Sequence, residues 1–231
     1  MKYCISDMHG EYDMTLRLLD EIGFSDDDTL IIVGDIIDKG KDSVRLANFI
    51  FSLTNSICVL GNHEYDFLKR YRAMTKEDGV DFDRVLDELR GWFPYDGRLL
   101  DWDTIDGFEG MRNYYEEDAF ICAHAGVPLD GEGRILPLEN AYVEQLVYDR
   151  VFKNSDTKVI SDKCVLYGHT PTCALSNNND YRIIKYRRDG AGSGGRSIAD
   201  YSRVHLDTGV YLTDMLGCFC LDTCECFYVR R

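Results

Sequence analysis

Five short apolar runs, each followed directly by acidic, amide or histidine residues, constrain this chain more than any other feature of its sequence. Runs of three or four residues that are apolar on both faces are typical of buried strands in an α/β sheet. Polar residues at the carboxyl ends of such strands collect at one edge of the sheet. We therefore expect one shared site, built by the residues that follow the runs 3–5, 30–33, 57–60, 120–123 and 164–167.

Segments with helical spacing lie between the first three runs. Their apolar stripes consist of Leu16, Leu19 and Ile22 in the first segment and of Val44, Ala47 and Phe51 in the second. This alternation of strands and helices predicts a layered α/β fold.

Two further segments have patterns of their own. Residues 65–118 predict a helical excursion, in which Val85 and Leu89 lie on a helix that ends before Pro94. Residues 204–229 predict consecutive strands separated by turns at Gly217 and at Asp222-Thr223.

The length of 231 residues suits one domain, and no linker rich in proline, glycine or serine divides the chain, so we expect a single domain over residues 1–231. The net charge of −15 argues against stable binding to nucleic acid or to an anionic membrane, since both need a basic face. No apolar run is long enough to span a membrane, and Met1 leads directly into the first run, which argues against a signal peptide. We therefore expect a cytoplasmic protein whose nine cysteines are reduced thiols.

The polar residues form five motifs that contain the donors of a metal site. In chain order they are Asp7-Met8-His9-Gly10, Gly34-Asp35-Ile36-Ile37-Asp38-Lys39-Gly40, Gly61-Asn62-His63-Glu64, His124-Ala125-Gly126 and Gly168-His169-Thr170. Asp7 and His9 are separated by one residue, so an extended backbone would direct both side chains to the same side. Asp35 offers two oxygens that can bridge two ions. Any one motif could be an ordinary turn or cap, but five in this order, each after an apolar run, predict a metal site.

The remaining donors complete the predicted ligand set. Asn62 offers a neutral carbonyl oxygen, while His124 and His169 offer imidazole nitrogens. Mixed oxygen and nitrogen ligation without thiolates favours Mn, Fe or Zn over Ca or Mg. Two such ions can activate water and stabilise the charge on a phosphoryl group during an in-line displacement.

These motifs resemble those of the phosphoprotein-phosphatase branch of the calcineurin-like metallophosphoesterases. This family includes bacterial and phage Ser/Thr phosphatases and symmetrical diadenosine tetraphosphate hydrolases. The family pattern is D-x-H-G, G-D-x-x-D-R-G, G-N-H-E/D, H-A/G-G and G-H-T, and Leu206-Asp207-Thr208-Gly209 also resembles the family's end. The resemblance covers nearly the whole chain apart from residues 65–118 and 174–203. It implies a layered α/β/β/α sandwich.

Carried over by position, the resemblance implies two divalent ions, with Mn as the leading candidate and Fe or Zn as alternatives. It implies one ion held by Asp7, His9 and Asp35 and a second held by Asp35, Asn62, His124 and His169. His63 would be a general acid rather than a ligand, and Asp38 would orient it. An imidazole paired with a carboxylate is favoured in its protonated form, as a proton donor must be.

The match departs from the family pattern at two positions. Lys39 replaces the arginine of G-D-x-x-D-R-G, so we expect it to attract a phosphoryl oxygen but to orient it less firmly than a planar guanidinium would. Leu60 stands where protein phosphatases commonly carry an arginine, which favours the diadenosine tetraphosphate hydrolases. Arg150 resembles a family arginine that contacts phosphate, although it could also be the solvated end of a helix.

Three other features favour ordinary structural roles. His205 matches no family ligand and is expected to be a hydrogen-bonded strand histidine. The Gly-rich stretch 190–195 formally matches G-x-G-x-x-G but lacks the strand and helix of a dinucleotide site, and we expect a loop that could close over an anionic substrate. The four thiols near the C-terminus do not have zinc-site spacing, and we expect buried apolar side chains at Cys218, Cys220, Cys224 and Cys226.

The leading function from sequence is hydrolysis of phosphate monoesters by metal-activated water, with a Ser/Thr phosphoprotein as substrate. A symmetrical bis(5'-nucleosyl)tetraphosphate hydrolase is the alternative. The most distant alternative is an inactive metal-dependent module that binds phosphorylated partners. Intact His63, Asp38 and ligand residues argue against that last function.

Overall fold

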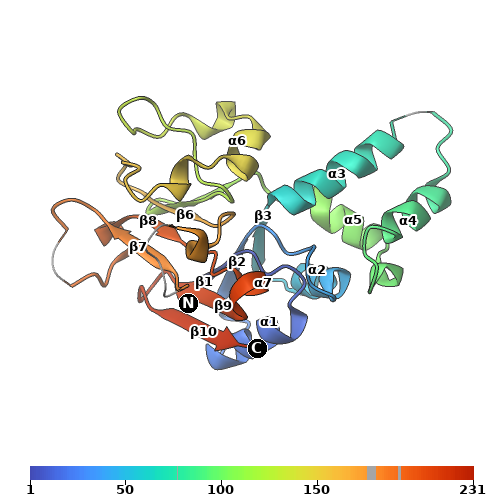
Figure 1. The fold of residues 1–231 in the computed structure, drawn as a ribbon, viewed down its shortest axis with the longest axis horizontal. Coiled ribbons are helices and arrows are strands. Elements are labelled where there is room, and N and C mark those ends of the chain that lie inside the picture. Colours follow the sequence, from blue (N-terminus) through green and yellow to red (C-terminus); the bar gives the residue numbers. More distant parts are fainter. Residues whose placement is uncertain (77, 176–180, 192–193) are drawn as a thin grey trace.

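Two five-stranded β-sheets form the centre of the protein (Figure 1). The computed structural model describes residues 1–76, 78–175, 181–191 and 194–231. The first sheet has the order β10-β9-β1-β2-β3, and the second has the order β4-β5-β6-β8-β7. The strands of the first sheet are β1 (Lys2–Ile5), β2 (Thr29–Val33), β3 (Ser56–Val59), β9 (Met215–Cys220) and β10 (Cys226–Arg230). Those of the second are β4 (Tyr115–Glu116), β5 (Phe120–Cys122), β6 (Cys164–Tyr167), β7 (Ile184–Arg187) and β8 (Tyr201–His205).

Parallel strands occupy the middle of both sheets. In the first sheet β1, β2 and β3 are parallel neighbours, and in the second β5, β6 and β8 are. The antiparallel strands β9 and β10 extend one edge of the first sheet, while β4 and β7 form the edges of the second. All five apolar runs of the sequence lie on parallel strands, which confirms this part of the prediction.

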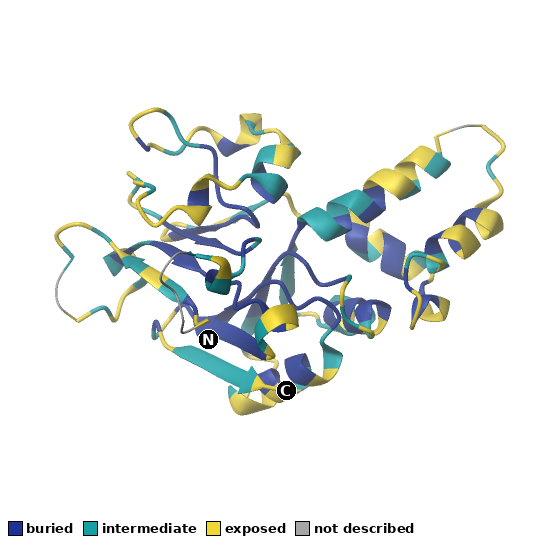
Figure 2. Ribbon diagram, viewed as in Figure 1, coloured by how far each residue is buried: buried dark blue, intermediate teal, exposed yellow. Residues whose placement is uncertain are grey.

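Three apolar clusters account for the layers. Alternate residues of the central strands point to opposite faces, so Cys4, Ile31 and Val33 pack toward the second sheet against Cys122 and Leu166. Their neighbours on the other face pack under the helices of the first sheet. The outer face of the second sheet is covered by Leu138, Leu146 and Phe152 from short helices. The result is the predicted α/β/β/α layering, with central strands such as β2, β5, β6 and β9 buried and the edge strands β7 and β10 more exposed (Figure 2).

The helices divide into two groups. Those that cover the sheets are α1 (Tyr12–Glu21), α2 (Ser43–Ser52), α6 (Val143–Tyr148) and the short α7 (Val210–Thr213). Between β3 and β4 the chain contributes α3 (Asn62–Met74), α4 (Phe82–Arg90) and α5 (Trp102–Glu109), which project to one side of the sheets (Figure 1). The predicted helix through Val85 and Leu89 is α4, and both residues are buried. Among the described residues, no helix is long and apolar enough to cross a membrane.

Two details of the sequence prediction were wrong. The buried face of α1 consists of Met14, Thr15, Leu18 and Leu19, whereas Leu16 is only partly buried. Leu19 and Ile22 of the predicted stripe do pack in the core, but Met14 and Leu18 take the place predicted for Leu16. Gly217 lies inside β9 rather than at a turn. An added Cβ at Gly217 would crowd Thr208 and Tyr228, so this glycine serves close packing within the sheet.

Three of the four C-terminal cysteines are buried as the sequence predicts, while Cys226 is only partly buried. Cys218 and Cys220 pack in the core under the helices, while Cys224 and Cys226 pack between the sheets. All four are free thiols, and three are buried. Because the pairs face different cores, the four sulfurs do not converge on one point.

Candidate metal centre

The predicted ligands converge at the carboxyl ends of the parallel strands of both sheets. Asp7 follows β1, Asp35 follows β2, and Asn62 begins α3 directly after β3. From the second sheet, His124 follows β5 and His169 follows β6. The two sheets thus bring residues that are far apart in sequence to one edge, as strand-end polar residues of α/β folds do.

Asp35 lies at the centre of this group. Its Oδ1 is 3.4 Å from Nε2 of His124, and its Oδ2 is 3.7 Å from Nε2 of His9. Within the described residues, two sets of side chains could each hold a metal ion, and both include Asp35: one with His9 and His63, the other with His124 and His169. One carboxylate therefore faces two sets of nitrogen donors with its two oxygens.

Asn62 and Asp7 connect the remaining donors. The Oδ1 of Asn62 is 3.1 Å from Nε2 of His124 and 2.8 Å from Nδ1 of His169. The backbone N–H of His169 donates to both carboxylate oxygens of Asp7, at 3.2 and 3.1 Å. Asp7 is thereby held between the two sheets.

The donor chemistry of His124 requires a positive charge at this point. Its Nδ1 is 2.9 Å from the carbonyl oxygen of Val33, so Nδ1 carries a proton and the state of Nε2 decides the charge of the ring. Nε2 faces the Oδ1 atoms of Asn62 and Asp35, which are both acceptors, so it needs either a proton of its own or a bound cation. Burial alone would lower the pKa of His124, but the charge of Asp35 outweighs it and raises the pKa to about 10. The site therefore attracts a cation, and a metal ion fits these donors.

His9 has the same arrangement on the other side of Asp35. Its Nδ1 is 2.9 Å from the carbonyl oxygen of Ile37, which leaves the Nε2 lone pair directed into the site. Burial lowers the pKa of His9 in spite of the nearby carboxylates, so the ring is neutral, as a ligand imidazole must be. In both histidines a backbone carbonyl fixes the ring and its tautomer.

His63 differs from His9 in the partner of its second nitrogen. Its Nε2 is 3.8 Å from Oδ2 of Asp35, nearly the same distance as that of His9, so proximity alone does not separate their roles. However, Nδ1 of His63 is 2.7 Å from Oδ2 of Asp38, a carboxylate. Burial lowers the pKa of His63, but the hydrogen bond to Asp38 and the charge of Asp35 outweigh it and raise the pKa overall. Trp92 donates from Nε1 to the other oxygen of Asp38 at 2.8 Å.

Glu64 organises the loop that carries Asp35, a role that sequence reasoning missed. Its fully buried carboxylate accepts hydrogen bonds from the backbone N–H groups of Asp35, Ile36, Ile37 and Gly61, at 2.8–3.1 Å. Burial and the charge of Asp35 raise the pKa of Glu64 to about 7. A sequence signal existed only for the bond to Gly61, because a Glu three residues after a helix N-cap is the pattern of a capping box.

The backbone of the site is in an unusual conformation. Among the described residues, nine non-glycine residues have positive φ, and six of them belong to the site motifs. These six are Asp7, His9, Asp35, Asp38, Lys39 and His169, with φ between 45° and 70°. The sequence prediction of an extended backbone at Asp7 and His9 was therefore wrong: left-handed turns, not strand alternation, aim these side chains. Such conformations cost energy and concentrate at functional sites.

Two glycines of the motifs leave room for the ligands. Gly34 has a φ of +80°, and an added Cβ there would overlap the ring of His124. An added Cβ at Gly168 would overlap Oδ2 of Asp7. These glycines precede Asp35 and His169 in the sequence because a side chain at either position would fill the centre.

The two predicted phosphate-binding residues flank the ligands. The Nζ of Lys39 is 2.7 Å from Nε2 of His9, at the edge of the ligand group. Arg150 donates from its guanidinium to Oγ1 of Thr170 at 3.0 Å. Burial, followed by the charges of His124 and Arg150, lowers the pKa of His169 to about 4. Lys39 thus borders the site at His9, and Arg150 borders it at Thr170, next to His169.

His205 and Asp207 lie at the end of β8 and were not predicted as ligands. His205 is a buried strand histidine whose Nε2 is 2.6 Å from the carbonyl oxygen of Thr170, while its ring stacks on Tyr167. Its Nδ1 has no hydrogen-bond partner in the described part of the chain. Asp207 accepts from the N–H of Gly209 at 2.7 Å, and burial together with the charge of Asp7 raises its pKa. Asp207 thus adds a second buried carboxyl next to Asp7.

The Gly-rich stretch 190–195 lies partly outside the described residues, which omit 192 and 193. The short β7 before it is partly exposed along its length, and the next described helix is the single turn Ile198–Asp200. Neither element has the form of a dinucleotide-binding strand or helix.

Comparisons with known proteins agree with the fold. The calcineurin-like phosphoesterase family model matches residues 3–184. The symmetrical bis(5'-nucleosyl)-tetraphosphatase of Salmonella paratyphi B is 32% identical over 127 residues, which cover 54% of this chain and 43% of that protein. The chain thus matches less than half the length of that relative.

Solved structures resemble the whole chain at low sequence identity. A candidate diadenosine tetraphosphatase superposes with a TM-score of 0.69 at 17% identity, covering 99% of this chain and 92% of that chain. A cold-active protein-tyrosine phosphatase from a psychrophilic Shewanella species superposes with a TM-score of 0.58 at 14% identity, covering 99% and 80%. At these identities the likeness establishes the fold.

Proposed function

The chain belongs to the calcineurin-like phosphoesterase family, and on that premise we propose that it hydrolyses phosphoric esters with two divalent metal ions bridged by Asp35. The observation that carries the proposal is the position of Asp35, whose two oxygens face separate pairs of imidazole nitrogens. Two ligand sets that share one carboxylate are the arrangement that a binuclear centre needs.

The proposed ligands divide at Asp35. One ion would be held by Asp7, His9 and Asp35, and the other by Asp35, Asn62, His124 and His169. The neutral state of His9 and the position of Nε2 of His124, close to the Oδ1 atoms of both Asp35 and Asn62, support this division. Because the donors are oxygen and nitrogen without thiolate, we propose Mn as the native metal, with Fe or Zn as alternatives. When bound, the ions would supply an activated water and stabilise charge on the phosphoryl oxygens.

His63 is proposed as the general acid. Its Nδ1 donates to Asp38, so the proton available for a leaving group sits on Nε2, which faces the site. Asp38, held in turn by Trp92, keeps the ring oriented and favours its protonated form. The carboxylate partner is what distinguishes His63 from the proposed ligand His9.

Lys39 and Arg150 are proposed to hold the phosphoryl oxygens. The Lys39 ammonium is in contact with a proposed ligand, and Arg150 is anchored to Thr170 next to another. A guanidinium can contact two phosphate oxygens in parallel, whereas an ammonium provides a compact charge. We expect Arg150 to orient the phosphate and Lys39 to attract it.

Two substrate classes are proposed. A Ser/Thr phosphoprotein is the one expected from the motif set. A symmetrical dinucleoside tetraphosphate is equally supported, because relatives at 32% identity are named for that activity and Leu60 stands where protein phosphatases commonly carry an arginine. Leu60 is apolar and buried, so it can neither supply a charge to a phosphopeptide nor contact one directly. Binding to nucleic acid is not part of the proposal, given the net charge of −15.

We also propose a domain organisation and a cellular compartment for the protein. Residues 1–231 would act as one domain, with α3, α4 and α5 as a helical excursion beside the site. A reducing compartment such as the cytoplasm suits a chain with nine free thiols, most of them buried.

Turnover of p-nitrophenyl phosphate with added Mn tests the proposed reaction. We expect metal-dependent hydrolysis that is abolished by a chelator. Metal binding without any turnover would instead support a module that only binds phosphorylated partners. A panel with a phosphoserine peptide and diadenosine tetraphosphate then separates the two substrate classes by their kcat/KM.

A further inference from the structure

A cavity of about 530 Å³ lies directly beside the candidate metal centre. It is formed by the start of α1, the loop after β2, the segment after α4 and the C-terminal part of the chain. Lys39 lines this cavity, and its Nζ is also 2.7 Å from Nε2 of His9. The side chain of Lys39 therefore belongs both to the wall of the cavity and to the edge of the ligand group.

The charge of this cavity is opposite to that of the protein. Four lining side chains are basic and two are acidic: Arg17, Lys39, Lys41 and Arg231 against Glu11 and Asp13. The whole chain, in contrast, has a net charge of −15. A locally positive cavity in an acidic protein attracts an anionic ligand.

The basic residues differ in how far they are neutralised. Arg231 is paired with both Glu11 and Asp214. Arg17 donates to the backbone carbonyl of Arg230, and Lys39 contacts the ring of His9. The charges of Arg17 and Lys39 are therefore not offset by a carboxylate in the contacts that the structure describes, and both remain available to a phosphate.

Two exposed tyrosines line the same cavity. Tyr95 is 74% exposed and Tyr211 is 58% exposed, while the buried Met14 supplies an apolar surface. Exposed aromatic rings beside basic residues are the combination that binds nucleotides, because bases stack on the rings and phosphates pair with the cations. Inorganic phosphate has no aromatic group that could stack on these rings.

We propose that this cavity is a nucleoside-binding subsite, which holds the base and sugar of a nucleoside phosphate while its phosphate reaches the metal centre past Lys39. The inference rests on the proposed function and selects the nucleotide class among its substrates. The base would stack on Tyr95 or Tyr211, and Arg17 and Lys39 would contact the phosphates. A dinucleoside polyphosphate has both a base that can stack on a tyrosine and phosphates that can contact Arg17 and Lys39.

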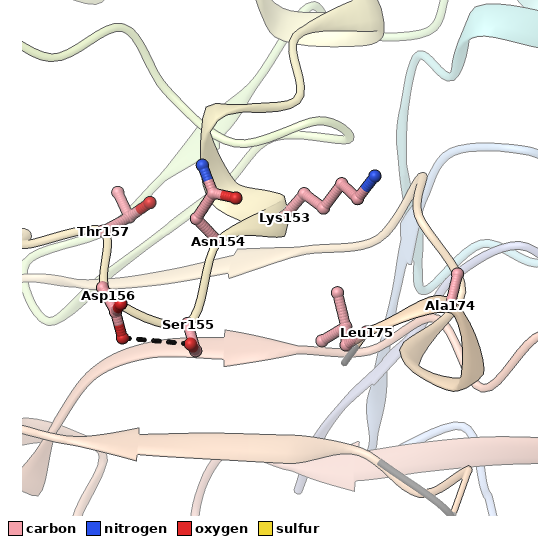
Figure 3. Close-up of a pocket in the computed structure, with 7 residues that line it drawn as sticks. All are labelled: Lys153, Asn154, Ser155, Asp156, Thr157, Ala174 and Leu175. Carbon is pink, nitrogen blue, oxygen red and sulfur yellow. Dashed lines mark hydrogen bonds between the residues drawn. The ribbon is translucent and has the colours of Figure 1, made fainter. Parts of the chain in front are cut away.

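Another cavity, of about 570 Å³, lies beside the second sheet and lacks this combination (Figure 3). It offers one basic and one acidic side chain and no aromatic ring; its lining residues are Lys153, Asn154, Ser155, Asp156, Thr157, Ala174 and Leu175. It includes none of the proposed ligands. A further cavity combines basic residues with Tyr186 but likewise includes none of the proposed ligands. Because Lys39 contacts His9, we assign the nucleoside to the cavity that Lys39 lines.

The test compares two probes that differ only in the base: adenosine 5'-monophosphate and ribose 5-phosphate. Their dissociation constants are measured by calorimetry with Mn-loaded protein. Wild type should bind the nucleotide on the order of tenfold more tightly, the effect expected from one stacked base. The double variant Tyr95→Ala/Tyr211→Ala should lose this ratio. Tyr142→Ala is the matched control, because Tyr142 is 76% exposed but does not line the cavity, and it should keep the ratio.

Equal affinities of wild type for the two probes would overturn the subsite. So would a double variant that keeps the wild-type ratio, or one that loses affinity for a phosphoserine peptide instead. Failure of the proposed function is a separate result, namely no turnover of p-nitrophenyl phosphate, and does not depend on the probe ratio.

Discussion

The imidazole of His63 and the carboxylate of Asp38 form a close pair, with 2.7 Å between Nδ1 and Oδ2. This pair leaves Nε2 of His63 directed toward the proposed metal centre. If His63 is the general acid, His63→Asn should keep both metal ions and lose about 10²–10⁴-fold in rate on substrates with poor leaving groups. Activated aryl phosphates should lose less, because their leaving groups need little protonation. Metal analysis and rates on both substrate types check this, and loss of an ion from the variant would contradict it.

The same pair predicts a change in pH dependence. The hydrogen bond to Asp38 raises the pKa of His63, and a general acid is active only while protonated, so activity should fall as pH rises through that pKa. Asp38→Asn removes the charge, lowers the pKa, and should move the alkaline limb of the kcat profile to lower pH. An alkaline limb that stays in place would assign it to another group.

Lys39 is the departure from the family pattern that can be tested directly. If it contacts phosphate, Lys39→Ala should weaken inhibition by inorganic phosphate by about 1.5–3 kcal/mol, the range for a charged hydrogen bond. Lys39→Arg should change the phosphate inhibition constant while the metal content stays constant. If wild type, Lys39→Ala and Lys39→Arg have the same phosphate inhibition constant, Lys39 does not contact phosphate. Arg150 would then be the residue that binds the phosphoryl oxygens.

Gly168 should be intolerant of a side chain for a local reason. An added Cβ would overlap Oδ2 of Asp7, so Gly168→Ala should lower metal content and activity together. Gly131→Ala is the control, since no atom lies within 4 Å of a Cβ at Gly131. Normal metal content in the Gly168 variant would show that Asp7 can move without loss of the site.

The sequence predicted the layers and the convergence of the motifs because both depend on local pattern. Apolar runs such as 30–33 form strands buried on both faces, and the polar residues after parallel strands must meet at one edge. The orientation of the individual side chains could not be predicted in the same way. Asp7 and His9 depend on positive φ angles, which are uncommon for any residue other than glycine, and Glu64 binds backbone groups of the Asp35 loop that only the folded chain brings near.

The cavity beside Lys39 shows another limit of sequence reasoning. Arg17, Tyr95 and Tyr211 come from three separate parts of the chain and belong to no motif. Arg17 lies on α1, Tyr211 lies on α7 and Tyr95 follows α4, so their meeting depends on tertiary packing. Sequence analysis therefore identified the candidate site residues that belong to the family motifs. It did not identify residues such as Tyr95 and Tyr211, which only the folded structure brings together.

His205 should make stability depend on pH. Burial lowers its pKa to about 4, so the native ring stays neutral while the unfolded ring gains a proton below about 6.5. Its contribution is fully present above pH 6.5 and is lost as pH falls toward 4. Between pH 8 and pH 5, metal-free wild type should lose about 2 kcal/mol more unfolding free energy than His205→Gln. The unfolding free energies are measured by denaturant titration. If both proteins lose the same unfolding free energy between pH 8 and pH 5, His205 does not titrate in this way.

The most direct test of the binuclear centre is the metal content of pure protein reconstituted with Mn. Wild type should bind two ions per chain, and Asp35→Asn should bind fewer and lose turnover, because its side chain has only one oxygen to offer and no charge. One ion per chain in the wild-type protein, or two ions in an inactive Asp35→Asn variant, would contradict the bridging role of Asp35.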